Sequence, residues 1–150
     1  MKINVSHETR KGGNMNFFNV EQTKLLKNYK NKYDFLIGQQ GYGKTYYQIT
    51  KMLMKLNFDI KSIGFQYWVV ALIIYKKNFY KYDNTIESVY SEVAKTFHTT
   101  RTRVERTMRT ASEEAKKTIA KDFEYNKKLT NKTILKLLTH NVCVINMKGE

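Results

Sequence analysis

The sequence predicts an all-α protein: a compact helical domain with a helix-turn-helix, preceded by a short helical or irregular N-terminal extension. The chain has 150 residues and no proline, and only Gly64 among its glycines lies between Thr45 and the last two residues. Apolar residues recur at helical spacing over this stretch, which favours helices over a turn-rich β fold. A single domain of this length can bury a core without metals or disulfides.

The chain divides into an extension, a domain and a tail. Its start is polar and lacks periodicity, which is typical of a disordered terminus. The first residues of the domain that share one helical face are Ile49, Met52, Leu53 and Leu56. The expected boundaries are 1–45 for the N-terminal extension, with 1–16 disordered, 46–141 for the helix-turn-helix domain and 142–150 for the C-terminal tail.

Apolar spacing and helix-end signals predict each helix in turn. The segment 63–79 is apolar nearly all round, so it should be the central buried helix. Asn57 and Asp59 suggest a break before it, and Asn84 followed by Glu87 resembles a capping box that opens the next helix. The expected helices are 20–33, 46–56, 63–79, 85–97, 101 to about 120 and 133–139, while 33–37 suits a strand or a helix, 122–131 is a polar connection and 142–145 a small apolar tail.

The expected helices 85–97 and 101–120, with the turn 98–100 between them, fit a helix-turn-helix. Ala94 supplies the small residue needed where the helices cross, ten residues before the apolar Val104. An ordinary helical hairpin with a solvated basic face would give the same pattern, so spacing alone leaves both interpretations open. The residues left on the outer face are Thr102, Arg103, Glu105, Arg106 and Arg109.

Positive charge is in large excess, with 27 lysines and arginines against 13 acidic residues and a net charge of +14. Such an excess favours a polyanionic partner, and nucleic acid is the first candidate. A lysine-rich surface from an AT-rich genome explains the charge equally well, since all but five of these residues are lysines. The arginines favour nucleic acid, because four of the five lie within 101–109 and their planar fork suits guanine edges and phosphates.

A basic outer helix face of this kind fits the major groove of double-stranded DNA. Arginine can bond guanine O6 and N7 together, and glutamate can accept from cytosine N4. Threonines at the helix start can bind phosphates through their hydroxyls and through free N–H groups. The expected DNA-binding residues are Thr99, Thr100, Thr102, Arg103, Glu105, Arg106 and Arg109.

A resemblance to a known family is carried by the run FHTTRTRVERTMR at residues 97–109. It resembles the recognition segment of the C-terminal DNA-binding effector domain of the stage-zero sporulation master regulator, the sporulation initiation factor A family, which carries a similar NTT..RVER.IR segment. The likeness extends to ITKMLMKLNFDIKSIGFQYW at 49–68 and KLTNKTILKLL at 128–138, and spans about 49–140. It implies an all-α DNA-binding domain that reads a TGTCGAA-type promoter box.

The resemblance also implies roles and partners. By position, Glu105 and Arg106 would contact bases, Arg109 a base or a phosphate, and Thr102 and Arg103 would lie at the groove. The family's domain pairs head to tail on adjacent boxes, which implies a homodimer on DNA through helix 133–139. The family's phosphorylated receiver domain has no counterpart here, because the first 45 residues are too few to form one.

A second motif competes with this interpretation. The run GQQGYGKT at 38–45 satisfies the phosphate-loop pattern GxxxxGK[ST], follows an apolar run and precedes a helix. Gly38, Gly43, Lys44 and Thr45 are therefore candidate nucleotide-binding residues. A phosphate loop works within a parallel sheet that has a second acidic strand, and no later apolar β run ends in Asp. A glycine loop that joins the N-terminal helix to the domain, or grips a DNA phosphate, explains the run better.

Other chemistries find little support. Cys143 is the only cysteine and the three histidines are scattered, so no zinc spacing and no intrachain disulfide are available. We expect no catalytic residues, no metal and no cofactor. The longest apolar stretch, 65–75, is far shorter than the roughly 20 residues of a membrane span, and the N-terminus lacks the apolar middle of a signal peptide. We therefore expect a cytoplasmic protein without membrane contact.

The sequence thus predicts a non-enzymatic, sequence-specific DNA-binding protein, a transcriptional regulator that reads the major groove with helix 101–120. Two alternatives stay open. One is a protein-targeting inhibitor of phage or mobile-element type, which would place its basic helical surface on a host protein. The other is a nucleotide-binding protein that uses the loop 38–45.

Overall fold

The computed structural model describes residues 17–33, 42–79 and 84–147. Helices fill most of these ranges and no strand occurs in them, so the all-α prediction is confirmed. The expectations for 1–16 and 34–37, and the loop residues 38–41, lie outside the described residues. The helices are α2 (Val20–Lys32), α4 (Tyr42–Lys55), α5 (Ile63–Lys77), α6 (Ile86–Phe97), α7 (Arg101–Ser112), α8 (Lys116–Asp122) and α9 (Asn131–Met147).

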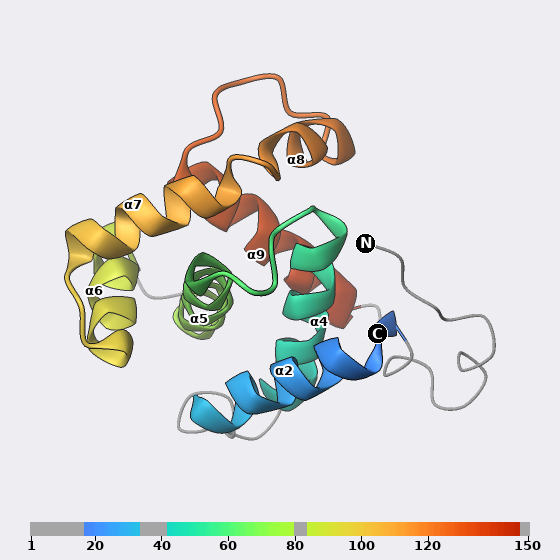
Figure 1. Ribbon diagram of the computed structural model, residues 1–150. Coiled ribbons are helices and arrows are strands. Elements are labelled where there is room, and N and C mark those ends of the chain that lie inside the picture. Colours follow the sequence, from blue (N-terminus) through green and yellow to red (C-terminus); the bar gives the residue numbers. More distant parts are fainter. Residues whose placement is uncertain (1–16, 34–41, 80–83, 148–150) are drawn as a thin grey trace.

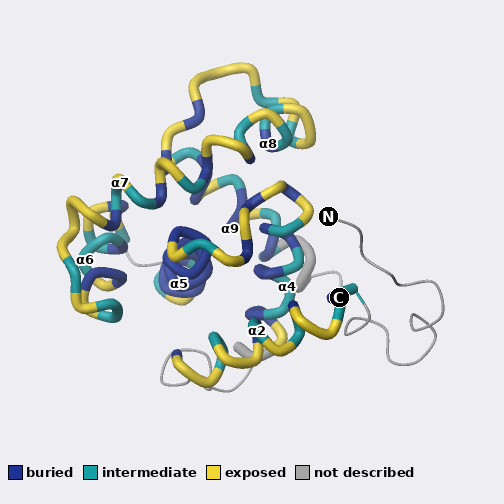
Figure 2. Tube along the Cα trace, in the orientation of Figure 1, coloured by how far each residue is buried: buried dark blue, intermediate teal, exposed yellow. Residues whose placement is uncertain are grey.

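Helix α5 is the central helix, as its apolar composition predicted. Every residue from Gly64 to Tyr75 is buried. Figure 1 shows α5 nearly end-on, and α4, α6, α7 and α9 surround and contact it. The same helix is dark blue along most of its length in Figure 2. A helix that is apolar on all sides is stable only in such a position, because each side needs a neighbour that excludes water.

Helix α2 is part of the same core. A capping box starts it, in which Asn19 Oδ1 accepts from Gln22 N at 2.8 Å and Gln22 Oε1 from Asn19 N at 3.1 Å. Leu26 has no exposed surface, and its carbonyl accepts from Tyr46 Oη at 2.6 Å. Tyr33, at the end of α2, bonds Gln66 of α5 through its hydroxyl. Burial raises the pKa of both phenols, so they remain neutral donors.

Three helices end in the same way without a glycine. Asn57, His98 and Glu124 have φ of 75°, 55° and 50°, and each follows a helix. After α4, for example, the N–H of Asn57 bonds Met54 O at 3.1 Å and the N–H of Phe58 bonds Leu53 O at 3.0 Å. This is a Schellman motif, which satisfies the last carbonyls of the helix. The predicted break at Asn57 is thereby confirmed.

Helix α4 begins at Tyr42, four residues before its predicted start. Two predicted helix boundaries in the helix-turn-helix region are also wrong, and side-chain hydrogen bonds explain both. Helix α6 is capped by Thr85 and Ser88 rather than by Asn84 and Glu87; the amide of Asn84 instead donates to Tyr75 O at 3.2 Å. The predicted helix 101–120 is instead two helices, α7 and α8. They are separate because, just after Ser112, backbone N–H groups donate to the carbonyl three residues earlier instead of four. The hydroxyl of Ser112 bonds Arg109 O at 3.0 Å and competes with the helical pattern.

The last helix is longer than its apolar spacing predicted. Helix α9 begins at Asn131 and continues to Met147, whereas the sequence predicted a helix over 133–139 followed by a tail. Val142 lies within α9 and is buried. The helix continues because its inner side still meets the core beyond Thr139.

Helices α5 and α7 approach each other closely at Gly64. A Cβ atom built on Gly64 would lie less than 3.0 Å from the Cβ of Ala111 and 3.2 Å from the carbonyl oxygen of Thr107, both on α7. One turn further along α5, Trp68 Nε1 donates to Met108 O at 2.9 Å. The backbones therefore pack directly on each other, and the indole fixes how far α7 slides along α5.

We expect Gly64→Ala to destabilise the protein. Alanine gains at most about 1 kcal/mol of helix propensity, whereas forcing the contact with Ala111 costs about 1–3 kcal/mol. Urea unfolding should show a lower midpoint, and Gly64→Ala combined with Ala111→Gly should recover part of the loss. A midpoint equal to or above that of the wild type would show that the helices are not this close.

We expect Leu26→Ala to cost about 2–5 kcal/mol of unfolding free energy, because it opens a cavity in the core. Lys27→Ala, one residue along on the exposed side of α2, is the matched control and should stay within about 0.5 kcal/mol of wild type. Equal urea midpoints for the two variants would show that α2 does not unfold together with the domain.

Candidate nucleic-acid interface

Helices α6 and α7 form the predicted helix-turn-helix. Helix α6 ends at His98, whose left-handed conformation turns the chain, while the N–H of Thr99 bonds Ala94 O at 2.9 Å. Thr100 then caps α7, since its hydroxyl oxygen accepts from Arg103 N at 3.2 Å. Histidine takes the left-handed conformation more readily than most residues, although glycine is the usual choice. The turn is therefore built without the glycine that helix-turn-helix proteins often carry.

Helix α7 has a buried side and an exposed side, as predicted. Val104 and Met108 have no exposed surface and pack in the core, while Ala111 is partly buried beside Gly64. The opposite side carries the residues that were expected to bind DNA. Thr102, Arg103, Arg106 and Arg109 are exposed, and Glu105 is partly buried.

Two of these residues are paired with each other. Arg109 Nη1 lies 2.7 Å from Glu105 Oε2, one helical turn away. Because both side chains are partly in solvent, such a pair contributes at most about 1 kcal/mol. Arg103 and Arg106 have no carboxylate within ion-pair distance in the part of the chain that the structure describes. Their guanidinium groups are therefore free to bind an anion or a base edge.

Helix α9 contributes a residue that sequence reasoning missed. The side-chain amide of Asn131 donates to Tyr90 Oη of α6 at 3.0 Å and to Glu105 O of α7 at 3.2 Å. It thereby joins three helices beside the exposed face of α7. Burial raises the pKa of the Tyr90 phenol, and the hydrogen bond from Asn131 partly opposes this. The polar sequence around Asn131 reads as a connection, and no local signal reveals a contact between residues so far apart.

The two turn threonines differ in what they can offer a phosphate. Thr99 is half-buried and its N–H is already bonded to Ala94 O. Thr100 is exposed, and its hydroxyl proton remains available although its oxygen caps α7. The prediction that both contact DNA phosphates stays a prediction.

The phosphate-loop match is only partly described. Gly38 lies outside the described residues, and Gly43 is in the first turn of α4. Lys44 is exposed, whereas Thr45 is buried. The described ranges hold no strand that could carry a phosphate loop in a sheet.

Neither a membrane span nor a metal cluster is found in the described ranges. No helix there is both long and apolar enough to cross a bilayer. No group of three histidine, cysteine or acidic side chains there could hold a metal ion.

Comparison with known families identifies the domain. The model of the family described as "Sporulation initiation factor Spo0A C terminal" matches residues 49–142, more than half of the chain. No curated protein and no solved structure matches the chain. The matched segment runs from within α4 into α9 and includes the whole helix-turn-helix, while α2 lies before it. The chain therefore belongs to the Spo0A C-terminal domain family, whose members bind double-stranded DNA and regulate transcription.

Proposed function

We propose that the protein reads a short DNA sequence by inserting α7 into the major groove. The observation that carries this proposal is the exposed side of α7, where Arg103 and Arg106, which have no ion-pair partner among the described residues, project from a helix whose other side is packed against α5. A helix held in this way can present side chains to base edges without moving. The family match supports the DNA partner, and the exposed side of α7 supports the mode of binding.

The roles of the side chains follow from their chemistry. Arg106 and Arg103 can each bond guanine O6 and N7 with two parallel N–H groups. Glu105 can accept from cytosine N4, provided that its pair with Arg109 opens or is shared with the base. Thr102 lies at the edge of the same face, and Thr100 is placed to donate to a phosphate at the start of α7.

Pairing of two copies on adjacent sites, through residues 133–139, stays a prediction. Ile134, Leu135 and Leu138 are buried in the chain's own core and could not form such an interface. The partly buried Thr133 and Leu137 and the exposed Lys136 are the side chains of this segment that remain accessible to a second copy. A homodimer through this helix would therefore be small and largely polar.

We expect Arg106→Ala to lose about 1–3 kcal/mol of binding free energy for the target duplex and much less for a scrambled duplex. The target is first selected from a pool of random duplexes bound by the wild type. Fluorescence anisotropy at fixed salt then compares both duplexes.

Arg106→Lys is the matched control, because lysine keeps the charge and loses the planar fork. It should lose discrimination between the two duplexes while keeping the salt dependence of the wild type. If Arg106→Ala binds target and scrambled duplex as the wild type does, Arg106 is not a base-reading residue.

A further inference from the structure

Two exposed lysines lie beside the exposed side of α7: Lys128 just before α9, and Lys132 in its first turn. Residues 128–132 alternate between the surface and the core: Leu129 and Asn131 are each 7% exposed, whereas Lys128, Thr130 and Lys132 are exposed. The alternation directs both lysines outward from a backbone that is held by its buried neighbours. The stretch KLTNKTILKLL, which is part of the family resemblance, includes both lysines, but the resemblance gave them no role in DNA binding.

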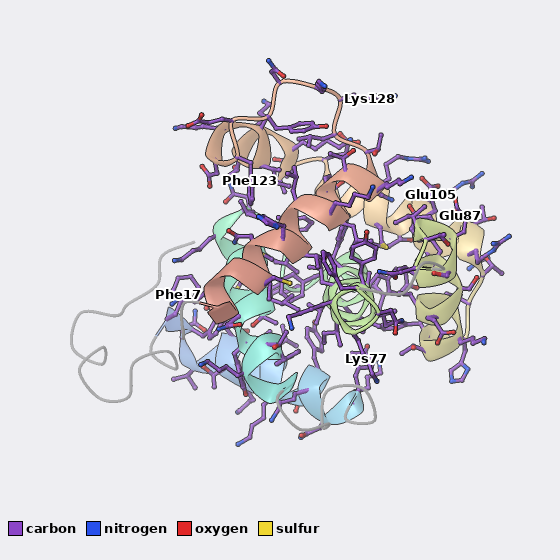
Figure 3. The ribbon with its side chains drawn as sticks, turned by 180° about the vertical axis from the view of Figure 1, so that it is seen from behind. Phe17, Lys77, Glu87, Glu105, Phe123 and Lys128 are labelled. Atoms are coloured by element: carbon purple, nitrogen blue, oxygen red, sulfur yellow. The ribbon has the colours of Figure 1, made fainter. Side chains whose placement is uncertain are left out.

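Hydrogen bonds fix this segment relative to α7. Asn131 lies between the two lysines and bonds both Tyr90 and the carbonyl of Glu105. Thr130 caps α9, its hydroxyl oxygen accepting from Thr133 N at 3.2 Å. Figure 3 shows Lys128, Glu105 and Glu87 toward the same end of the molecule, away from Phe17 and Lys77. The lysines therefore lie on the same end of the protein as the exposed face of α7.

The ammonium groups of Lys128 and Lys132 form no ion pair with the residues that the structure describes. Elsewhere on the surface, Lys116 pairs with Glu113 at 3.1 Å and Lys95 with Glu92 at 3.6 Å. Within the ranges that the structure covers, no carboxylate lies within ion-pair distance of Lys128 or Lys132.

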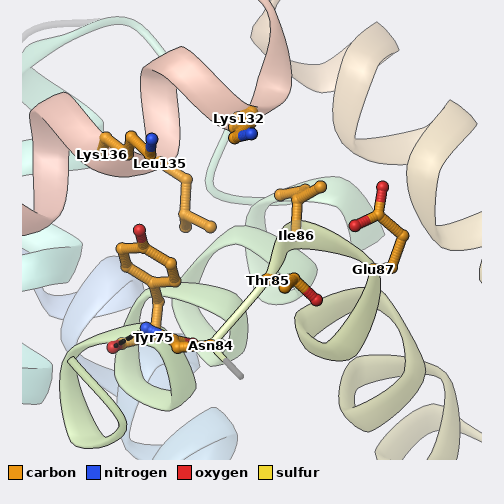
Figure 4. A pocket seen from close by; sticks show the side chains of 8 residues that line it. All are labelled: Tyr75, Asn84, Thr85, Ile86, Glu87, Lys132, Leu135 and Lys136. Atoms are coloured by element: carbon orange, nitrogen blue, oxygen red, sulfur yellow. Dashed lines mark hydrogen bonds between the residues drawn. The ribbon is translucent and has the colours of Figure 1, made fainter. Parts of the chain in front are cut away.

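A pocket lies between the start of α9, which carries Lys132, and the start of α6. Figure 4 shows Lys132 and Lys136 across this pocket from Ile86 and Glu87. The pocket has a volume of about 220 Å³. Glu87 lies on the far side of the pocket and forms no ion pair with Lys132 or Lys136. Both of these lysines are exposed to solvent.

We propose that Lys128 and Lys132 bind backbone phosphates of the duplex whose groove receives α7. The inference rests on the proposed function, because it is the DNA bound by α7 that brings phosphates to this end of the molecule. Charge complementarity and continuity with the exposed face of α7 favour the DNA backbone as the occupant. These contacts add affinity and fix the orientation of the duplex without reading its sequence.

The test is the salt dependence of binding by Lys128→Ala/Lys132→Ala. Each lost phosphate contact lowers the slope of log K against log salt by about 0.9, so the double variant should lose about 1.8. The loss should be the same on the selected target and on a scrambled duplex. The matched control is Lys24→Ala/Lys27→Ala, which removes two exposed lysines of α2, on the side of the molecule away from α7 (Figure 1). The control should keep the wild-type slope.

Two further variants separate charge from fold. Lys128→Arg/Lys132→Arg keeps both charges and should restore the slope. Lys128→Gln/Lys132→Gln removes the charges, keeps longer side chains and should reproduce the loss; it replaces the alanine variant if that variant unfolds. A wild-type slope in the alanine and glutamine variants, or an equal loss in the α2 control, would overturn the proposal.

The scrambled duplex keeps this test independent of base reading. If Arg106→Ala leaves discrimination unchanged but the lysine variants lose slope on both duplexes, the mode of base reading fails and the phosphate contacts stand. If Arg106→Ala abolishes discrimination but the lysine variants keep the wild-type slope, the phosphate contacts fail and base reading stands.

Discussion

The direct contact between the backbones of α5 and α7 at Gly64 determines how the rest of the domain is arranged. Any larger residue at position 64 would push the two helices apart. This separation would also break the hydrogen bond from Trp68 to the carbonyl of Met108. The position of α7 in turn decides where its outer side chains stand relative to α6 and α9. A recognition surface built on a helix can be no better defined than the packing beneath that helix, which explains why so much of the core converges on α5.

The structure distinguishes two groups of positively charged side chains. Many lysines are exposed on helix surfaces, and two of the described ones, Lys95 and Lys116, pair with neighbouring glutamates. Arg103, Arg106 and Lys132 differ because they form no ion pair with any residue that the structure describes and because buried neighbours hold their backbone. Net charge alone predicts attraction to any polyanion, whereas in the proposed mode of binding the fixed positions of Arg103, Arg106 and Lys132 would favour one orientation of the duplex.

Periodicity in the sequence was sufficient to locate α5 and the two sides of α7, because burial depends on the apolar spacing that the sequence displays directly. Periodicity did not locate helix ends that depend on a single side-chain hydrogen bond. Thr85 rather than Asn84 caps α6, and the hydroxyl of Ser112 bonds a backbone carbonyl where α7 ends. The family resemblance pointed to Arg106 and its neighbours. It did not reveal Asn131, whose contact with Glu105 joins residues 26 apart in the chain, nor the need for glycine at position 64, which only the helix crossing explains.

Helix α2 precedes the segment shared with the family, yet its inner side chains fill the core, and it lies away from α7 (Figure 1). Its outer side chains are thus both firmly anchored and remote from the face of α7. A fluorophore or a surface tether attached at Lys24 would report on, or immobilise, the whole molecule while leaving α7 facing the solution.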